Sequence, residues 1–192
     1  MAAILIVPGL GDSGPDHWQT WLEARERSAL RITQENWCEP DLERWSARLR
    51  EAIDLAVGPV WLVGHSFGCL VSVHAVAECP DRVVGALLVA PADPDRVGVG
   101  SALSTTRLAF PSLLVASTTD PWLKLSTATH WADQWGSRLV NLGAAGHINV
   151  DSGYGPWPEG QALLRQLQER HGQMAPPSSS LQCRPGMTVS GF

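Results

Sequence analysis

Short apolar runs alternate with amphipathic segments along most of this chain. A strand that is apolar on both faces needs a helix on each side, so the alternation predicts an α/β fold with a parallel sheet in the middle of three layers. Right-handed crossovers then connect the strands. We expect about six strands, at 3–7, 31–34, 60–63, 83–89, 112–117 and 137–142. The helical patterns lie at 16–30, from 42 to just before 58, and at 67–78, 122–135 and 158–171.

The 192 residues suffice for one domain with a sizeable core, and we expect that domain to span 1–172. From Gln173 onward the chain is rich in proline and serine and shows no hydrophobic period. This composition predicts a flexible tail over 173–192. Residues 91–110 could form a cap, but they carry few large apolar side chains. We therefore expect an open pocket without a large lid.

Charge and composition exclude several classes of partner. The chain has 19 acidic and 14 basic residues and no basic run, which argues against nucleic acid as a partner. No apolar stretch reaches the roughly 18 residues of a membrane span, and the apolar N-terminus lacks the basic region of a signal peptide. The four cysteines lack metal-ligand spacing, so we expect no metal and a reduced, cytoplasmic location. The oligomeric state is not readable from the sequence.

The segment Gly64-His65-Ser66-Phe67-Gly68 fits the pattern G-x-S-x-G. It follows a predicted strand and opens a predicted helix, which is the context in which this pattern forms a sharp turn that exposes a nucleophilic serine. The turn lifts the hydroxyl above the sheet edge and places it at a helix N-terminus, which favours developing negative charge. The alternative is a glycine-rich turn that holds an ordinary serine. We expect Ser66 to be a nucleophile.

A serine hydroxyl needs a general base at neutral pH. His147 lies in a loop of small residues, 143–149, directly after the last predicted strand and at the same sheet edge as Ser66. We therefore expect His147 to be the base. The other histidines have other expected roles. His17 and His130 lie on predicted helices, His74 lies in the core on the helix at 67–78, and His171 lies near the tail. We expect His65, beside Ser66, to pack or to form a hydrogen bond.

The base needs an acid to orient it, and the chain order serine, acid, histidine is typical of this architecture. Asp120 follows the strand predicted at 112–117 and lies at the correct edge. We favour it because its strand should neighbour the one that leads to His147. Asp93 and Asp95, which follow the preceding strand, are the alternatives. Asp151 is too close to His147 in sequence, and a loop or surface role suits it better.

Two backbone amides should stabilise the oxyanion of an acyl-transfer intermediate. We expect one from Phe67, the residue after the nucleophile. The other should come from the glycine-containing loop 8–12, with Leu10 as the first choice and Gly11 as the second. The alternative interpretation of this loop as a phosphate site is disfavoured, because it lacks both the lysine of a P-loop and the spacing of G-x-G-x-x-G.

Three of the nine tryptophans fall at the predicted catalytic edge of the sheet. We expect one or more of them to line the substrate pocket, and ordinary core packing is the alternative. They are Trp18, Trp122 and Trp157.

Several segments carry a resemblance to a known family: Val7-Pro8-Gly9, Asp16-His17-Trp18 with Trp21, the Gly64–Gly68 turn, Asp120-Pro121, Gly146-His147-Ile148-Asn149, Gly153-Tyr154-Gly155 and Trp157-Pro158. The chain resembles an α/β-hydrolase and, more closely, the small serine hydrolases of the YdeN and retinoblastoma-binding-protein-nine family. The resemblance covers about residues 3–171. The turn is shared across the superfamily, whereas the His-Trp and Gly-His-x-Asn segments are more specific.

The resemblance implies a compact α/β-hydrolase with the strand order 2-1-3-4-5-6, a triad of Ser66, Asp120 and His147, and no cofactor. It also implies esterase-like activity on a small molecule. We therefore expect a serine hydrolase that cleaves small to medium carboxylic esters through an acyl-enzyme intermediate. Two alternatives stay open. The same triad could hydrolyse amides or thioesters, or the fold could serve as a non-catalytic protein-interaction module.

Overall fold

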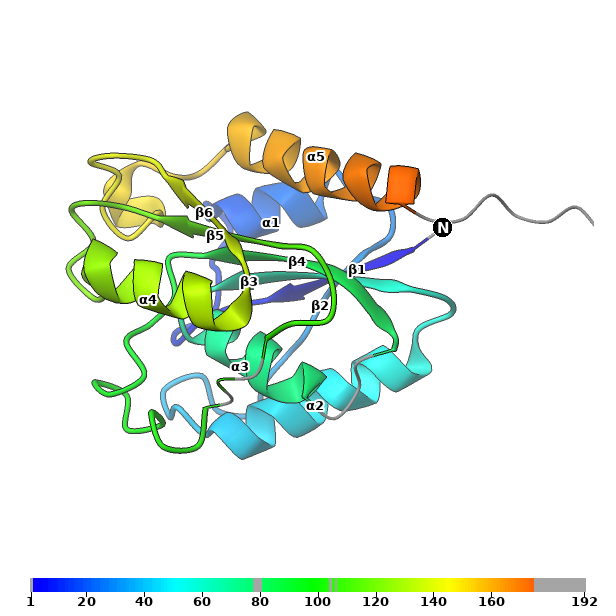
Figure 1. Ribbon diagram of the computed structural model, residues 1–192, viewed down its shortest axis with the longest axis horizontal. Coiled ribbons are helices and arrows are strands. Elements are labelled where there is room, and N and C mark those ends of the chain that lie inside the picture. Colours follow the sequence, from blue (N-terminus) through cyan, green and yellow to red (C-terminus); the bar gives the residue numbers. More distant parts are fainter. Residues whose placement is uncertain (1, 78–80, 104, 106, 175–192) are drawn as a thin grey trace, which may run out of the picture.

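The computed structural model describes residues 2–77, 81–103, 105 and 107–174. Six parallel strands form one sheet in the order β2-β1-β3-β4-β5-β6, as the resemblance implies (Figure 1). The strands are β1 (Ala3–Val7), β2 (Ala29–Arg31), β3 (Val60–His65), β4 (Val83–Val89), β5 (Ser112–Ala116) and β6 (Arg138–Asn141). The α/β prediction and the three-layer arrangement are confirmed.

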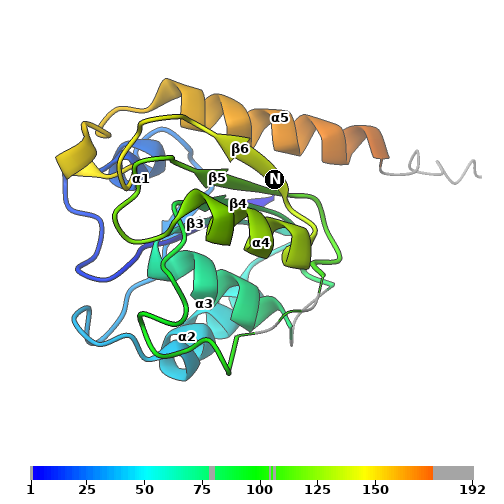
Figure 2. The same cartoon turned by 60° about the vertical axis from the view of Figure 1, so that its left-hand side comes forward.

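Helices cover both faces of the sheet, as Figures 1 and 2 show. On one face lie α1 (Trp18–Glu23) and α5 (Pro158–Met174). On the other lie α2 (Leu42–Leu55), α3 (Phe67–Val76) and α4 (Leu125–Trp135). Asp41 is the N-cap of α2, and its carboxylate accepts from the amide of Arg44.

The sheet divides the apolar interior into two cores. Successive strand residues point to opposite faces, so in β1 Leu5 belongs to the core under α2 and α3, whereas Ile6 belongs to the core under α1 and α5. The helix α3 is buried almost all round, which explains its uniformly apolar sequence. The central strands are therefore fixed from both sides, and their carboxyl ends form a rigid edge.

Two predicted boundaries near the N-terminus are wrong. The helix predicted over 16–30 ends at Glu23, and the strand predicted at 31–34 is Ala29–Arg31. The cause is tertiary: β2 must pair with β1 in parallel, with Ala29 opposite Ile4, so the chain leaves the helix early enough to turn back.

The helix predicted from Trp122 begins instead at Leu125. The amide of Trp122 donates to Asp120 Oδ1 at 2.9 Å, so residues 120–122 form a local turn rather than the first turn of a helix. This turn leaves both side chains at the carboxyl edge of the sheet.

The predicted domain boundary at 172 falls within a helix, because α5 continues to Met174. The rest of the predicted tail, 175–192, lies outside the described residues. The connection between β4 and β5 forms no helix or strand in its described residues. Across the described part of the chain, every helix is too short or too polar to cross a membrane.

Candidate active site

Ser66 occupies the turn between β3 and α3 with φ 53° and ψ −122°. A positive φ is unfavourable for a residue with a side chain, and such strain persists only where surrounding structure holds it. Here the amide of Ser66 donates to the carbonyl of Val89 at 3.1 Å, which fastens the turn to β4. The predicted strand–turn–helix context of the serine is therefore present.

Glycines make this turn possible because the backbone segments around it nearly touch. A Cβ at Gly68 would lie 2.1 Å from the carbonyl oxygen of Val7, and one at Gly64 would lie 3.0 Å from the Cα of Cys69. A Cβ at Gly9 would lie 2.7 Å from the Cβ of Ser66 itself. The need for the glycines at 64 and 68 follows from the sequence pattern. Direct contact between Gly9 and the serine does not, because it depends on how the first loop crosses the sheet edge.

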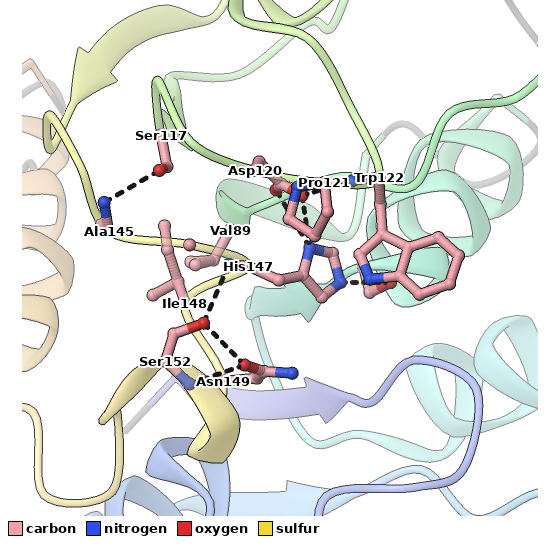
Figure 3. A network of polar contacts seen from close by, with 12 residues as sticks. Val89, Ser117, Asp120, Pro121, Trp122, Ala145, His147, Ile148, Asn149 and Ser152 are labelled. Carbon is pink, nitrogen blue, oxygen red and sulfur yellow. Dashed lines mark hydrogen bonds and ion pairs between the residues drawn. The ribbon is translucent and has the colours of Figure 1, made fainter.

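Ser66, His147 and Asp120 form a chain of polar contacts. His147 Nε2 lies 3.0 Å from Ser66 Oγ, and His147 Nδ1 lies 3.0 Å from both Asp120 Oδ1 and Asp120 Oδ2. The side chain of Asp120 is only 3% exposed. Figure 3 shows the imidazole directed at the carboxylate, with Trp122 beside it.

The alternative acids do not contact this imidazole. Asp93 Oδ1 accepts from the amide of Asp95. Asp151 lies in the 3-10 turn η1 (Val150–Ser152), and among the described residues neither it nor the other two bonds to the ring of His147. The order of serine, acid and histidine along the chain therefore points to the carboxylate that the structure places beside the His147 imidazole.

Small polar side chains hold the loop that carries His147, and sequence reasoning did not predict them. The amide of His147 donates to Ser152 Oγ, and that hydroxyl donates to Asn149 Oδ1 (Figure 3). The amides of Ala145 and Gly146 donate to the hydroxyls of Ser117 and Thr119. The only sequence signal was the density of Ser, Thr and Asn in these two loops.

Two further histidines lie near His147. His65 Nε2 donates to the carbonyl of His147 at 3.0 Å, which agrees with the expected hydrogen-bonding role. Burial is the main cause that holds the pKa of His65 well below its usual 6.5. His17 is the N-cap of α1, where its Nδ1 accepts from the amide of Gln19. Burial, and secondarily the charge of Arg31, lowers the pKa of His17 to about 4. Both rings are therefore neutral at physiological pH.

The backbone amides predicted to bind the oxyanion differ in whether they already donate a hydrogen bond within the protein. The amide of Gly11 donates to the carbonyl of Trp37 at 2.9 Å, so this second choice is not available to a substrate. The amides of Leu10 and Phe67 have no acceptor among the described residues. Leu10 and Phe67 thus remain the candidate pair.

A cavity of about 440 Å³ opens beside Ser66. Trp122, 54% exposed, lines it as expected. Arg96 also lines it and donates to the carbonyls of Pro121 and Trp122, and the guanidinium lies 5.2 Å from the indole centre of Trp122. The described residues include no group of three or more His, Cys, Asp or Glu side chains able to hold a metal ion.

Trp18 and Trp157 do not line this cavity. Both are buried in the core under α1 and α5, where their rings pack edge to face at 5.2 Å. The expectation of pocket contacts for these two side chains is therefore corrected in favour of packing. The cause is that α1 begins at Trp18 and turns this residue down onto the sheet. Trp18 Nε1 donates to the carbonyl of Ile148 at 2.9 Å, so it supports the site from beneath.

The sheet order, the strained serine turn and the position of the polar chain define an α/β-hydrolase fold. Residues 4–166 match the model of the serine hydrolase family, to which the chain therefore belongs. It is an enzyme, a hydrolase. No curated protein sequence matches it.

Solved structures agree with this assignment. A YdeN-like hydrolase from Pectobacterium atrosepticum is 38% identical and superposes with a TM-score of 0.85 over 89% of this chain and 92% of its own. The ydeN gene product of B. subtilis is 20% identical, with a TM-score of 0.74 over 88% of this chain and 100% of its own. Est1E from Butyrivibrio proteoclasticus, solved with ferulic acid, is 13% identical, with a TM-score of 0.67 over 88% and 90%. The last two show likeness of fold alone.

Proposed function

We propose that this hydrolase cleaves small to medium carboxylic esters through an acyl-enzyme formed on Ser66. The observation that carries the proposal is the continuous chain from Ser66 Oγ through the imidazole of His147 to the carboxylate of Asp120, with every contact at 3.0 Å. The serine lines a cavity of suitable size for a small molecule.

In the first half of the reaction, Ser66 Oγ attacks the ester carbonyl while His147 Nε2 takes the hydroxyl proton. Asp120 holds the proton on Nδ1, which leaves Nε2 free to accept, and it stabilises the imidazolium that forms. The tetrahedral intermediate collapses when the C–O bond to the alcohol breaks and Nε2 returns its proton to the leaving oxygen. The acid part of the substrate stays on the serine as an ester.

In the second half, water replaces the alcohol. His147 Nε2 takes a proton from that water, whose oxygen attacks the acyl carbon. The second tetrahedral intermediate expels Ser66 Oγ, which recovers its proton from the imidazolium, and the carboxylic acid leaves. No cofactor takes part in either half of this sequence.

The amides of Leu10 and Phe67 would bind the oxyanion in both intermediates. Both lack a protein acceptor among the described residues, and Phe67 is the first residue of α3, where the helix dipole adds positive potential. The apolar side chains of Leu10, Val97 and Trp122 form a wall of the cavity, and this wall limits the size of the substrate. This wall suits short or medium acyl chains better than long lipids.

Covalent labelling separates an enzyme from a binding module. Incubation with a fluorophosphonate probe should add one phosphonyl group to the wild-type chain, and peptide mapping should locate it at Ser66. Ser66→Ala should remain unlabelled. Ser101→Ala is the control, because it removes an exposed hydroxyl that does not line the cavity, and it should be labelled like wild type. A folded wild-type protein that resists the probe would contradict the proposal.

A further inference from the structure

The backbone takes a positive φ on each side of His147, and on one side this conformation is unfavourable. Gly146 and Ile148, which flank His147, have φ angles of 55° and 50°. Isoleucine is β-branched and strongly disfavours positive φ, so Ile148 would relax if nothing opposed it. Relaxation would rotate the peptide plane between His147 and Ile148 and carry the imidazole away from the nucleophile.

Two side chains oppose that relaxation by binding consecutive carbonyls. His65 Nε2 donates to the carbonyl of His147 at 3.0 Å, and Trp18 Nε1 donates to the carbonyl of Ile148 at 2.9 Å. The donors come from different elements, since His65 ends β3 and Trp18 begins α1. Both peptide planes beyond the base are therefore fastened to the scaffold.

Burial makes these two bonds difficult to replace. Trp18 is 2% exposed, His65 is 5% exposed and Ile148 is fully buried. Water cannot readily substitute for a lost donor there, and an unpaired buried carbonyl is unfavourable. The rings of Trp18 and His65 also pack edge to face at 6.0 Å, so each donor restricts the other.

His65 links the nucleophile and the base directly. It is the residue before Ser66, and it holds the backbone of His147 while Ser66 Oγ meets the ring of the same residue. The two neighbouring residues His65 and Ser66 therefore contact His147 at its carbonyl oxygen and at Nε2, each at 3.0 Å. A neutral imidazole with its proton on Nε2 suits this task, and burial keeps His65 neutral by lowering its pKa.

We propose that Trp18 and His65 are positioning residues, which hold the loop of the general base in its strained working conformation through the carbonyls of Ile148 and His147. The inference rests on the proposed function, because it assigns these side chains a role in aligning His147 with Ser66. For Trp18, which does not line the cavity, it predicts an effect on the chemical step rather than on substrate binding.

Trp18→Phe tests the indole donor, because phenylalanine keeps an aromatic ring and removes the N–H. We expect kcat for a p-nitrophenyl ester to fall at least tenfold, with KM changed less than threefold, since Trp18 does not line the cavity. The matched control is Trp61→Phe, which makes the same change in the same core but beneath α5, where the ring packs against His171. Its kcat should stay within threefold of wild type. Equal kcat values for the two variants would overturn the role of Trp18.

His65 provides a second test that does not depend on the first variant folding. In His65→Gln the side-chain amide can still donate to the carbonyl of His147, whereas His65→Leu has no donor. We expect the glutamine variant to retain at least tenfold more kcat than the leucine variant. Identical kcat values in this pair would overturn the role of His65.

Labelling keeps the two proposals separate. If the wild-type protein reacts with the fluorophosphonate and turns over the ester but the variants match their controls, the positioning inference is overturned and the proposed function stands. If the wild-type protein neither reacts nor turns over the ester, the proposed function fails, and this inference fails with it.

Discussion

Three imidazole rings lie in a row beside Ser66. The ring centres of His17 and His65 are 4.8 Å apart, and those of His65 and His147 are 5.0 Å apart. A charge on His17 or His65 would be buried beside its neighbours, which is why both have lowered pKa values. In the proposed reaction, one positive charge develops in this row, and it does so on the ring that contacts Asp120.

The lowered pKa of His17 makes folding stability depend on pH. Between pH 6.5 and about 4 the unfolded chain binds a proton at this residue and the folded chain does not. The free energy of unfolding therefore falls as the pH drops through that window, by about 3 kcal/mol for this group, and the contribution is complete above pH 6.5. His17→Asn should flatten the dependence, because asparagine preserves an N-cap without titrating.

Urea unfolding of wild type and His17→Asn at pH 7.5, 6, 5 and 4.5 measures this difference. The variant should lose less stability than wild type between the first and last pH, whatever its stability at pH 7.5. Parallel losses in the two proteins would show that His17 is not a source of the acid sensitivity.

At the scale of elements, the close approach of β1 and α3 shapes the serine turn. Gly68 lies where the first turn of α3 meets the end of β1, and a Cβ there would be 2.1 Å from the oxygen of Val7 and 2.5 Å from that of Pro8. Both atoms are backbone and cannot move aside like the end of a side chain. The serine turn therefore depends on this contact as much as on the conformation of Ser66.

Gly68→Ala should lower the free energy of unfolding by about 2–3 kcal/mol, because the helix must shift away from the strand. Gly14→Ala is the control, since nothing lies within 4 Å of the added Cβ and its φ is not positive. The control should leave stability unchanged or raise it by up to about 1 kcal/mol. Chemical denaturation compares the two, and equal effects would show that the strand–helix contact is loose.

The element types were predictable because hydrophobic period, segment length and flanking turn residues together distinguish buried strands from helices. The boundaries of α1, β2 and α4 were not, because they depend on strand pairing and on the turn at Asp120. In the site, the chain order and loop positions were enough to predict that Ser66, His147 and Asp120 lie together, and the structure links their side chains by contacts of 3.0 Å. The hydroxyls of Ser117, Thr119 and Ser152 escaped prediction because their use depends on loop conformation.

Burial also explains why the prediction that tryptophans line the pocket held for only one of the three. The sequence places both Trp18 and Trp122 at the same predicted sheet edge as Ser66, yet Trp18 is buried and Trp122 is 54% exposed. Which side a short helix or a turn presents to the sheet follows from packing with distant residues such as Ile148 and Arg96. These contacts join residues that are far apart in the chain, and no local sequence pattern indicates them.

At the scale of the whole molecule, one sheet edge collects groups that are far apart in the chain. The loops after β1, β3, β5 and β6 supply Leu10, Ser66, Asp120 and His147 in turn. Parallel strands make this possible, because their carboxyl ends all meet at the same edge. The cores on both faces keep that edge rigid, and this rigidity maintains the 3.0 Å contacts among the last three residues.

Steady-state hydrolysis of p-nitrophenyl butyrate by wild type and Ser66→Ala is the sharpest test of the proposal that Ser66 is the nucleophile of this hydrolase. We predict that kcat falls by a factor on the order of 10⁶ in the alanine variant, with the fold intact by circular dichroism. Turnover by folded Ser66→Ala within tenfold of wild type would contradict the claim.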